Sequence, residues 1–193
     1  MLLGRHISLG PVIPVDFPSM FCWANDVDAA RFDFAYRPVD FVQHTQWCEN
    51  IGKDPTTVVF AIRKIGPDPA IIGYVRIFNI NGVHRSAEFG IRIGSEAQRG
   101  KGYGKEATAM TLDFCWNHLN LNRVQLIAFR HNERALSVYD ASGFEREGLL
   151  RRAVFINGDW ADLVVMAAFR PAKQERASDP ASRSAATPLA AVA

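Results

Sequence analysis

A glycine-rich stretch near the middle of the chain, Gln98-Arg99-Gly100-Lys101-Gly102-Tyr103-Gly104-Lys105-Glu106, constrains the fold more than any other feature. It follows a segment with strand character and precedes residues 105–119, whose apolar side chains repeat at helical spacing. Glycines at a strand-to-helix turn let backbone N–H groups approach an anion closely, and a helix N-terminus favours negative charge. The stretch therefore predicts a phosphate or pyrophosphate site, with a connector that binds no ligand as the alternative.

The spacing of this stretch excludes two familiar phosphate-binding motifs. A Walker A loop needs Gly-x-x-x-x-Gly-Lys-Ser/Thr, which is absent. The dinucleotide fingerprint needs Gly-x-Gly-x-x-Gly after a parallel strand, whereas Gly100, Gly102 and Gly104 alternate here and the preceding strands are expected to be antiparallel. The anion is therefore expected in a different kind of fold.

Hydrophobic periodicity predicts an α/β (α+β) chain. After a first strand and a proline-containing loop at 7–18, helices are expected at 19–34, 39–51, 105–119 and 133–141, and strands at 56–63, 70–77, 88–93, 123–129, 144–155 and 161–169. Short connections between 56 and 93 indicate an antiparallel meander. Asn157-Gly158 predicts a tight hairpin between the last two strands.

Composition bounds the remaining possibilities. The chain has 193 residues and a net charge of +2, which suits one domain over residues 1–170 and gives no basic stripe for nucleic acid. The polar, proline-containing segment 171–193 is expected to be a disordered tail. There is no long apolar run for a membrane span and no signal-peptide pattern. The cysteines, Cys22, Cys48 and Cys115, form neither a disulfide framework nor a CxxC metal pair, so a cytoplasmic protein without a metal site is expected.

Three blocks, in order, carry a resemblance to a known family. Arg99-x-x-Gly102-x-Gly104, preceded by Gln98, resembles the Q/R-x-x-G-x-G/A signature of the GCN5-related N-acetyltransferase (GNAT) superfamily. The segment 132–144 resembles its Asn-x-x-Ala-x-x-x-Tyr-x-x-x-Gly-Phe block, and 87–93 is similar to the strand before the loop. The resemblance covers residues 7–170. The segments 84–89 and 155–160 are similar to the branch that holds ribosomal-protein alanine acetyltransferases and spermidine acetyltransferases.

The resemblance implies a mixed, mostly antiparallel central sheet flanked by helices, with a splayed strand pair that holds acetyl-CoA as the acyl donor. In such a fold the backbone of Ile91 and Ile93 would pair with the pantetheine arm. Asn132 would hydrogen-bond the same arm, or would only cap the helix that follows it. The residues expected around the pyrophosphate are Gln98, Arg99, Gly100, Gly102, Gly104 and Lys105.

The resemblance also implies two catalytic side chains. An alkylamine with a pKa near 10.4 is only about 0.04% neutral at pH 7, so a base must remove a proton before the amine attacks. Glu88 is the expected base, acting through a water, and its alternative is a solvated residue paired with Arg92. Tyr139 is the expected acid to the leaving thiolate, and its alternative is a packed aromatic residue.

The acceptor is the least constrained part of the prediction. Aromatic residues of the first two helices, among them Trp23, Phe34 and Tyr36, would line an acceptor pocket or only pack in the core. The leading hypothesis is acetyl transfer to a primary amine of a small molecule (a polyamine, amino sugar, amino acid or antibiotic) by direct attack in a ternary complex. The alternatives are acetylation of a protein N-terminus and a non-catalytic acyl-CoA-binding module. A homodimer is expected from the resemblance alone.

Overall fold

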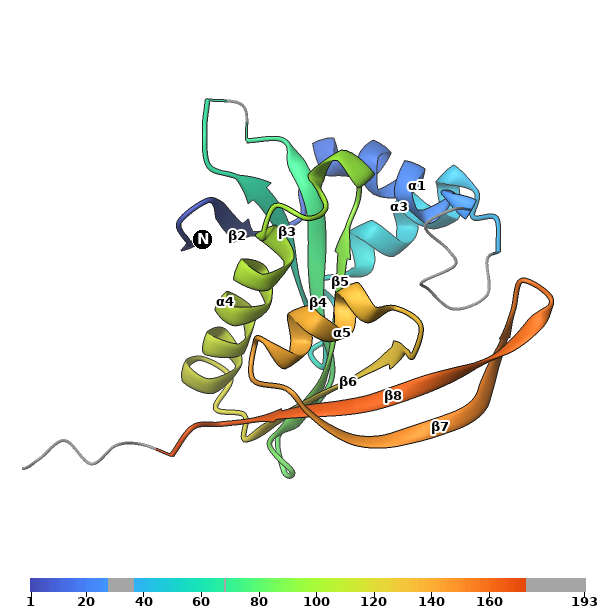
Figure 1. The fold of residues 1–193 in the computed structure, drawn as a ribbon. Helices are drawn as coiled ribbons and strands as arrows, with labels where there is room; N and C mark the ends of the chain where they lie inside the picture. Colours follow the sequence, from blue (N-terminus) through green and yellow to red (C-terminus); the bar gives the residue numbers. More distant parts are fainter. Residues whose placement is uncertain (28–36, 68, 173–193) are drawn as a thin grey trace, which may run out of the picture.

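One mixed sheet of eight strands runs through the part of the chain that the structure describes, in the order β1-β2-β3-β4-β5-β6-β8-β7 (Figure 1). The structure is a computed structural model that describes residues 1–27, 37–67 and 69–172. Neighbouring strands are antiparallel except β5 and β6, which are parallel. The strands are β1 (Leu2–Leu3), β2 (Ile7–Gly10), β3 (Val58–Lys64), β4 (Ile71–Asn81), β5 (Ser86–Ile93), β6 (Arg123–Phe129), β7 (Glu145–Ile156) and β8 (Asp159–Phe169).

Helices cover both faces of the sheet. Helices α1 (Phe17–Ala24) and α3 (Phe41–Asn50) lie on one face, while α4 (Tyr103–Asn117) and α5 (Glu133–Asp140) lie on the other (Figure 1). Ring contacts mark the two layers: Trp47 of α3 lies 6.5 Å from Tyr74, and Phe114 of α4 lies 5.0 Å from Phe60. Two short 3₁₀ turns, η1 (Pro14–Asp16) and η2 (Glu96–Gln98), precede α1 and α4. No helix in the described ranges is long and apolar enough to cross a membrane.

The parallel pair β5 and β6 stays together for only three positions. Ser86, Ala87 and Glu88 pair with Arg123, Val124 and Gln125. Beyond Glu88, β5 continues to Ile93 with β4 as its neighbour, while β6 continues to Phe129 with β8 as its neighbour. The two strands therefore separate, and their facing backbone groups beyond Glu88 are not used in the sheet.

Most of the expected elements are confirmed, with corrections at their ends. The meander β3-β4-β5 is antiparallel, and Asn157 and Gly158, both at positive φ, form the two-residue turn between β7 and β8. The helix expected at 19–34 is wrong in its extent, because α1 ends at Ala24. The side chain of Asn25 instead exchanges hydrogen bonds of 3.1 and 3.0 Å with the backbone of Val39. Phe34, Tyr36 and the expected tail beyond residue 172 lie outside the described residues.

A buried ion pair fastens the start of α1 to the sheet. Asp16 is 2% exposed, and its carboxylate accepts a hydrogen bond of 2.5 Å from Nη2 of Arg63 on β3. The same carboxylate accepts the backbone N–H of Ile13 at 2.8 Å, and Arg63 donates to the carbonyl of Pro11 at 3.2 Å. Among the described residues, the donors to this carboxylate therefore come from the segment that leads into α1 and from β3. The ion pair joins these two parts of the fold.

We expect Asp16→Ala to lower the free energy of unfolding by about 3–5 kcal/mol, because it leaves the Arg63 guanidinium buried without its partner. The matched control is Asp140→Ala, which removes an exposed pair with Arg146 and should leave the unfolding midpoint nearly unchanged. Urea denaturation followed by circular dichroism measures both. Equal losses in the two variants would contradict the role given to the buried pair.

Candidate functional site

The glycine loop ends in a helix N-terminus that no side chain caps among the described residues. Gly100 and Gly102 have φ values of +76° and +84°, which side-chain-bearing residues rarely adopt. Gly102 is the N-cap of α4, so the N–H groups of the first turn have neither an intrahelical acceptor nor a capping side chain. Gly104 and Lys105 belong to this first turn. The loop thus presents a set of unpaired donors at the positive end of a helix, which suits an anion.

A cation that the sequence did not single out lies over this loop. A Cβ atom at position 100 would come within 2.6 Å of Nη2 of Arg134, the second residue of α5. The Arg134 side chain is exposed and makes no hydrogen bond or ion pair with the described part of the chain. Arg134 lies within the Asn132–Phe144 block, and this was the one sequence signal that could have pointed to it. The family pattern accepts any residue at that position, so the signal was weak. Glycine is therefore favoured at position 100 by its φ, and the Arg134 guanidinium lies directly beside it.

Arg99, which was expected at the pyrophosphate, turns back toward the end of β5. Its guanidinium donates to the carbonyl of Gly94 at 3.2 Å and to that of Ile93 at 3.4 Å. Gln98 lies in the same turn, and its Oε1 is buried without a hydrogen-bond partner in the described structure. A half-turn of this amide would exchange its oxygen and nitrogen and present a donor instead. Arg99 thus shapes the loop, and Gln98 keeps an unused polar group within it.

On one side of the gap between β5 and β6 lies the β5 backbone that was expected to pair with the pantetheine arm. Helix α5 lies on the other side. Ile91 and Ile93 lie on the half of β5 that no longer pairs with β6, and both are partly buried against the core. Asn132 is the N-cap of α5, and its Oδ1 accepts the backbone N–H of Ala135 at 3.1 Å. The capping role of Asn132 is confirmed. Its contact with a ligand stays a prediction.

Tyr139 lies on α5 and packs against the core side of β5. It is 9% exposed, and its ring lies 6.3 Å from Phe89 and 5.8 Å from Phe144. Burial raises the pKa of its hydroxyl to about 12. This hydroxyl makes no hydrogen bond with any residue that the structure describes. The side chain is therefore a protonated donor at neutral pH with its hydrogen uncommitted.

Glu88 lies at the point where the gap opens, on the other face of β5. It is the last β5 residue that pairs with β6, and its neighbours Ala87 and Phe89 are buried toward the opposite face. Its Oε1 accepts a hydrogen bond of 2.9 Å from Nδ2 of Asn79, a residue at positive φ in β4. Arg92, the partner considered from the sequence, donates instead to the carbonyl of Trp23. Glu88 and Tyr139 thus flank β5 from opposite sides.

Trp23 was expected to line an acceptor pocket, and the structure places its ring against Gly94 at the end of β5. A Cβ atom at position 94 would overlap the indole, so only glycine fits there. Because Arg92 also donates to the Trp23 carbonyl, the end of α1 is held against the strand that leads into the glycine loop. Trp23 therefore contacts the proposed cofactor strand, and it does not line the cavity described next.

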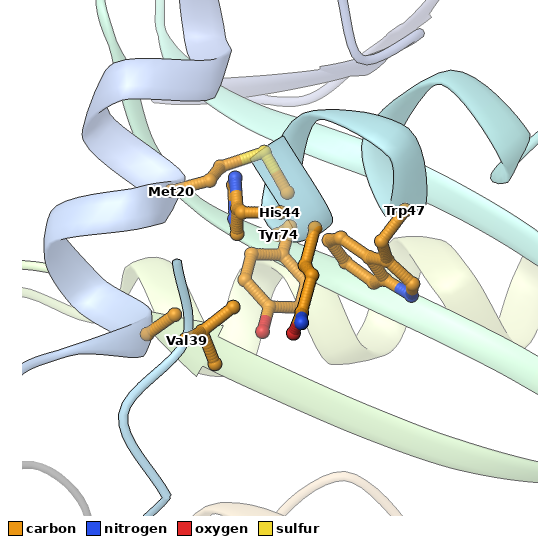
Figure 2. Close-up of a pocket in the computed structure, with 7 residues that line it drawn as sticks. Met20, Val39, His44, Trp47 and Tyr74 are labelled. Atoms are coloured by element: carbon orange, nitrogen blue, oxygen red, sulfur yellow. The ribbon is translucent and has the colours of Figure 1, made fainter. Parts of the chain in front are cut away.

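A cavity of about 360 Å³ lies between α1, α3 and β4, on the Glu88 face of the sheet (Figure 2). Figure 2 shows Met20, Val39, His44 and Trp47 gathered around the Tyr74 ring. Burial lowers the pKa of His44 and raises that of Tyr74, so both are uncharged at neutral pH. The described residues that line the cavity are Met20, Ala24, Val39, Gln43, His44, Trp47 and Tyr74. Within the described ranges, no three His, Cys, Asp or Glu side chains gather as metal ligands.

A sequence model of the acetyltransferase (GNAT) domain matches residues 6–145. The chain belongs to the GNAT acetyltransferase family. Among solved structures, a Vibrio cholerae spermidine N-acetyltransferase in complex with CoA and spermine is 27% identical, with a TM-score of 0.78 over 85% of this chain and 95% of that one. The expected GNAT fold is thus confirmed, including the separation of the two parallel strands.

Curated relatives match about half of the chain. Spermidine N(1)-acetyltransferase of Escherichia coli K12 is 40% identical over 98 residues, which are 51% of this chain and 52% of that protein. A putative ribosomal N-acetyltransferase of Bacillus subtilis, YdaF, is 34% identical over 97 residues, which are 50% of this chain and 52% of the relative. The chain therefore matches about half the length of these relatives, which are named for different acceptors.

We expect Arg134→Gln to raise the KM for acetyl-CoA about tenfold at unchanged kcat, because a charge-assisted hydrogen bond to phosphate contributes about 1.5–3 kcal/mol. Arg151→Gln on β7 removes the same charge away from the loop and serves as the control. Steady-state kinetics at saturating amine, with 3′-dephospho-acetyl-CoA as a second donor, measure the effect.

If the rise in KM disappears with the dephospho donor, Arg134 binds the 3′-phosphate. If the rise persists, Arg134 binds the pyrophosphate. An unchanged KM with both donors would contradict a phosphate contact.

Proposed function

We propose that the protein is an acetyl-CoA-dependent N-acetyltransferase whose acceptor is a primary amine of a small molecule. The observation that carries this proposal is the gap between β5 and β6, which has unpaired backbone along β5 and an uncapped helix N-terminus at the end of that strand. Family membership supports the same donor. Direct transfer from a thioester to an amine requires neither a metal ion nor a covalent enzyme intermediate. A cytoplasmic location, expected from the cysteines, and a homodimer, expected from the family, remain predictions.

The donor would lie along the open half of β5. The pantetheine amides would pair with the backbone near Ile91 and Ile93 as an added strand does. The pyrophosphate would accept hydrogen bonds from the loop at Gly100–Gly102 and the first turn of α4, with Arg134 above it. This assignment places the thioester end toward Glu88, at the point where β5 and β6 part. One cofactor would thus satisfy the donors of the strand and those of the loop.

The reaction removes two protons from the acceptor ammonium and returns one to the leaving sulfur. Glu88, through a water, would take a proton from the acceptor ammonium, and the neutral amine would then attack the thioester carbonyl. Collapse of the tetrahedral intermediate breaks the C–S bond, and the amide nitrogen loses its second proton as the thiolate leaves. A backbone N–H of β5 that faces away from β4 is suited to stabilise the oxyanion.

Tyr139 would stabilise the leaving thiolate as a hydrogen-bond donor. Its hydroxyl, with a pKa of about 12, is a weaker acid than a thiol with an ordinary pKa of about 8.5. Complete proton transfer from Tyr139 to the thiolate would therefore be uphill, whereas a hydrogen bond to the developing negative charge is favourable. The proton that finally neutralises the thiolate would come from the amide nitrogen or from water.

A protein N-terminus is the second candidate acceptor. The similarity to the putative ribosomal N-acetyltransferase of Bacillus subtilis favours it, and the similarity to spermidine N(1)-acetyltransferase favours a small amine. The cavity beside Tyr74 is compact and bounded by two helices, which suits a small ligand better than a chain (Figure 2). We therefore place the small amine first.

The direct test incubates the protein with acetyl-CoA and a panel of small amines and short peptides, and follows free thiol release and product mass. We expect acetylated small amines and amine-dependent thiol release. Acetylation of peptides alone would select the second candidate. Tight binding of acetyl-CoA without any amine-dependent turnover would contradict the proposal and leave a non-catalytic acyl-CoA-binding module.

Tyr139→Phe should lower kcat about 100-fold, because it removes the only donor assigned to the thiolate and leaves the ring packing with Phe89 intact. The Kd for acetyl-CoA should stay within about twofold of wild type on the same reasoning. Single-turnover kinetics and calorimetry measure the two quantities. A kcat like that of the wild type would remove Tyr139 from the chemistry.

Glu88→Gln should reduce kcat most strongly at low pH, where the amine is protonated and needs a base. As the pH approaches the pKa of the free amine, near 10.4 for an alkylamine, the deficit should shrink. Asn79→Ala is the control for the hydrogen bond that positions Glu88, and it should give a smaller deficit with the same trend. A deficit that does not change between pH 6 and pH 10 would contradict a base role.

A further inference from the structure

We infer that the cavity beside Tyr74 receives the body of the acceptor, and that this acceptor is a monoamine with a compact apolar body rather than a polyamine. This inference rests on the proposed function and adds a substrate class to it. The relatives that are named for spermidine point to a different acceptor. It rests on the position, the lining and the electrostatic surroundings of the cavity.

The cavity borders the strand that would hold the donor. Tyr74 lies at the floor of the cavity (Figure 2). In the sheet it pairs directly with Arg92 of β5, which lies between Ile91 and Ile93. It also lies on the face of the sheet that carries Glu88, as the alternation Glu88, Gly90, Arg92 shows. A ligand seated here would therefore lie against the donor strand, on the side from which the expected base acts.

The described lining is apolar with a few uncharged polar groups. Met20, Ala24, Val39 and Trp47 supply carbon surface, and the Trp47 and Tyr74 rings lie 6.5 Å apart. The polar groups are the Gln43 amide, the neutral His44 ring and the buried Tyr74 hydroxyl. About 360 Å³ is near the small end of ligand sites, which span roughly 300–1,000 Å³. Such a lining suits a compact body of ring or branched-alkyl type.

Two arginine side chains of the described structure lie near the floor. The Arg92 guanidinium lies on the strand beside Tyr74, and Arg76, two residues along β4 on the same face, stacks over Phe78 at 4.0 Å. Burial lowers the pKa of Arg92, as the neighbouring Arg99 also does, while Asp26 raises it. Arginine stays protonated at neutral pH in any case. Neither arginine lines the cavity, but the Arg76 charge acts on the Tyr74 hydroxyl, so a second ammonium group beside this hydroxyl would be repelled by Arg76.

Three carboxylates that the structure describes in the same layer already have partners. Asp16 pairs with Arg63, and Asp26 lies close enough to Arg92 to raise its pKa. Asp40 caps α3 by accepting the backbone N–H groups of Val42 and Gln43 at 2.9 and 3.0 Å. A polyamine needs carboxylates for the charges that it does not lose in the reaction, and these three serve the fold instead.

The test compares 2-phenylethylamine with spermidine as acceptors for the wild type. We expect kcat/KM to be at least about tenfold higher for 2-phenylethylamine, the lower end of what apolar contacts in a pocket provide. Trp47→Ala should lower kcat/KM for 2-phenylethylamine about 10- to 200-fold through KM, with little effect on spermidine and on acetyl-CoA binding. Trp47 is 39% exposed, so this variant should fold.

A negative charge placed in the cavity should shift the acceptor preference from 2-phenylethylamine toward spermidine. Gln43→Glu adds a carboxylate to the lining and should raise the spermidine to 2-phenylethylamine ratio of kcat/KM at least about tenfold. The matched control is Gln46→Glu, which adds the same charge to an exposed position of α3 that does not line the cavity. The control should leave the ratio unchanged.

Two results would overturn the inference: a wild-type preference for spermidine, or equal effects of Trp47→Ala on both amines. Calorimetry of 2-phenylethylamine against the CoA-bound protein separates this failure from failure of the proposed function. Trp47-dependent binding without acetylation of any amine would contradict the proposed function and leave the cavity assignment standing. Turnover of spermidine alone would contradict the cavity assignment and support the proposed function.

Discussion

The separation of β5 from β6 after Glu88 is the constraint on which the rest of the site depends. Inside a sheet, a strand normally satisfies its backbone groups on both sides, and unpaired buried N–H and C=O groups are costly. Here one side of β5 is unpaired from Phe89 to Ile93, although β4 continues to pair with its other side. A ligand with amide groups of its own can complete this strand. The fold therefore leaves one edge of β5 unpaired, where a continuous sheet would pair it with the neighbouring strand.

The end of β5 connects this unpaired edge to α1, to the glycine loop and to α4. Gly94 admits the Trp23 ring, Arg99 donates to the carbonyls at the strand end, and Arg92 donates to the end of α1. The glycine loop and α4 follow directly. Helix α1 also bounds the cavity beside Tyr74, so donor strand, phosphate loop and cavity share one set of contacts. A change at Gly94 or Trp23 would consequently alter both substrate sites together.

Local patterns in the sequence were sufficient to predict most helices and strands and to recognise the glycine loop. Alternation and helical spacing located the strands and helices, because each element buries one face, and Asn157-Gly158 marked its turn through backbone conformations that few residues adopt. Asn132 was recognised as a cap for the same local reason. The places where prediction failed depend on contacts between distant residues. The end of α1 is set by Asn25 and Val39, and Arg134 meets Gly100 only because α5 packs beside α4. Arg99 likewise turns toward carbonyls that the sequence could not place beside it.

The most direct measurement of the central claim is amide hydrogen exchange with and without acetyl-CoA, followed by mass spectrometry. If the open edge of β5 holds the donor, acetyl-CoA should slow exchange in peptides that cover residues 89–93 and 99–105. Exchange in β3 and β7, which lie away from the gap, should stay unchanged. Slower exchange at the loop alone would show that phosphate binds there without strand pairing. Unchanged exchange across 89–93 at saturating acetyl-CoA would contradict the account.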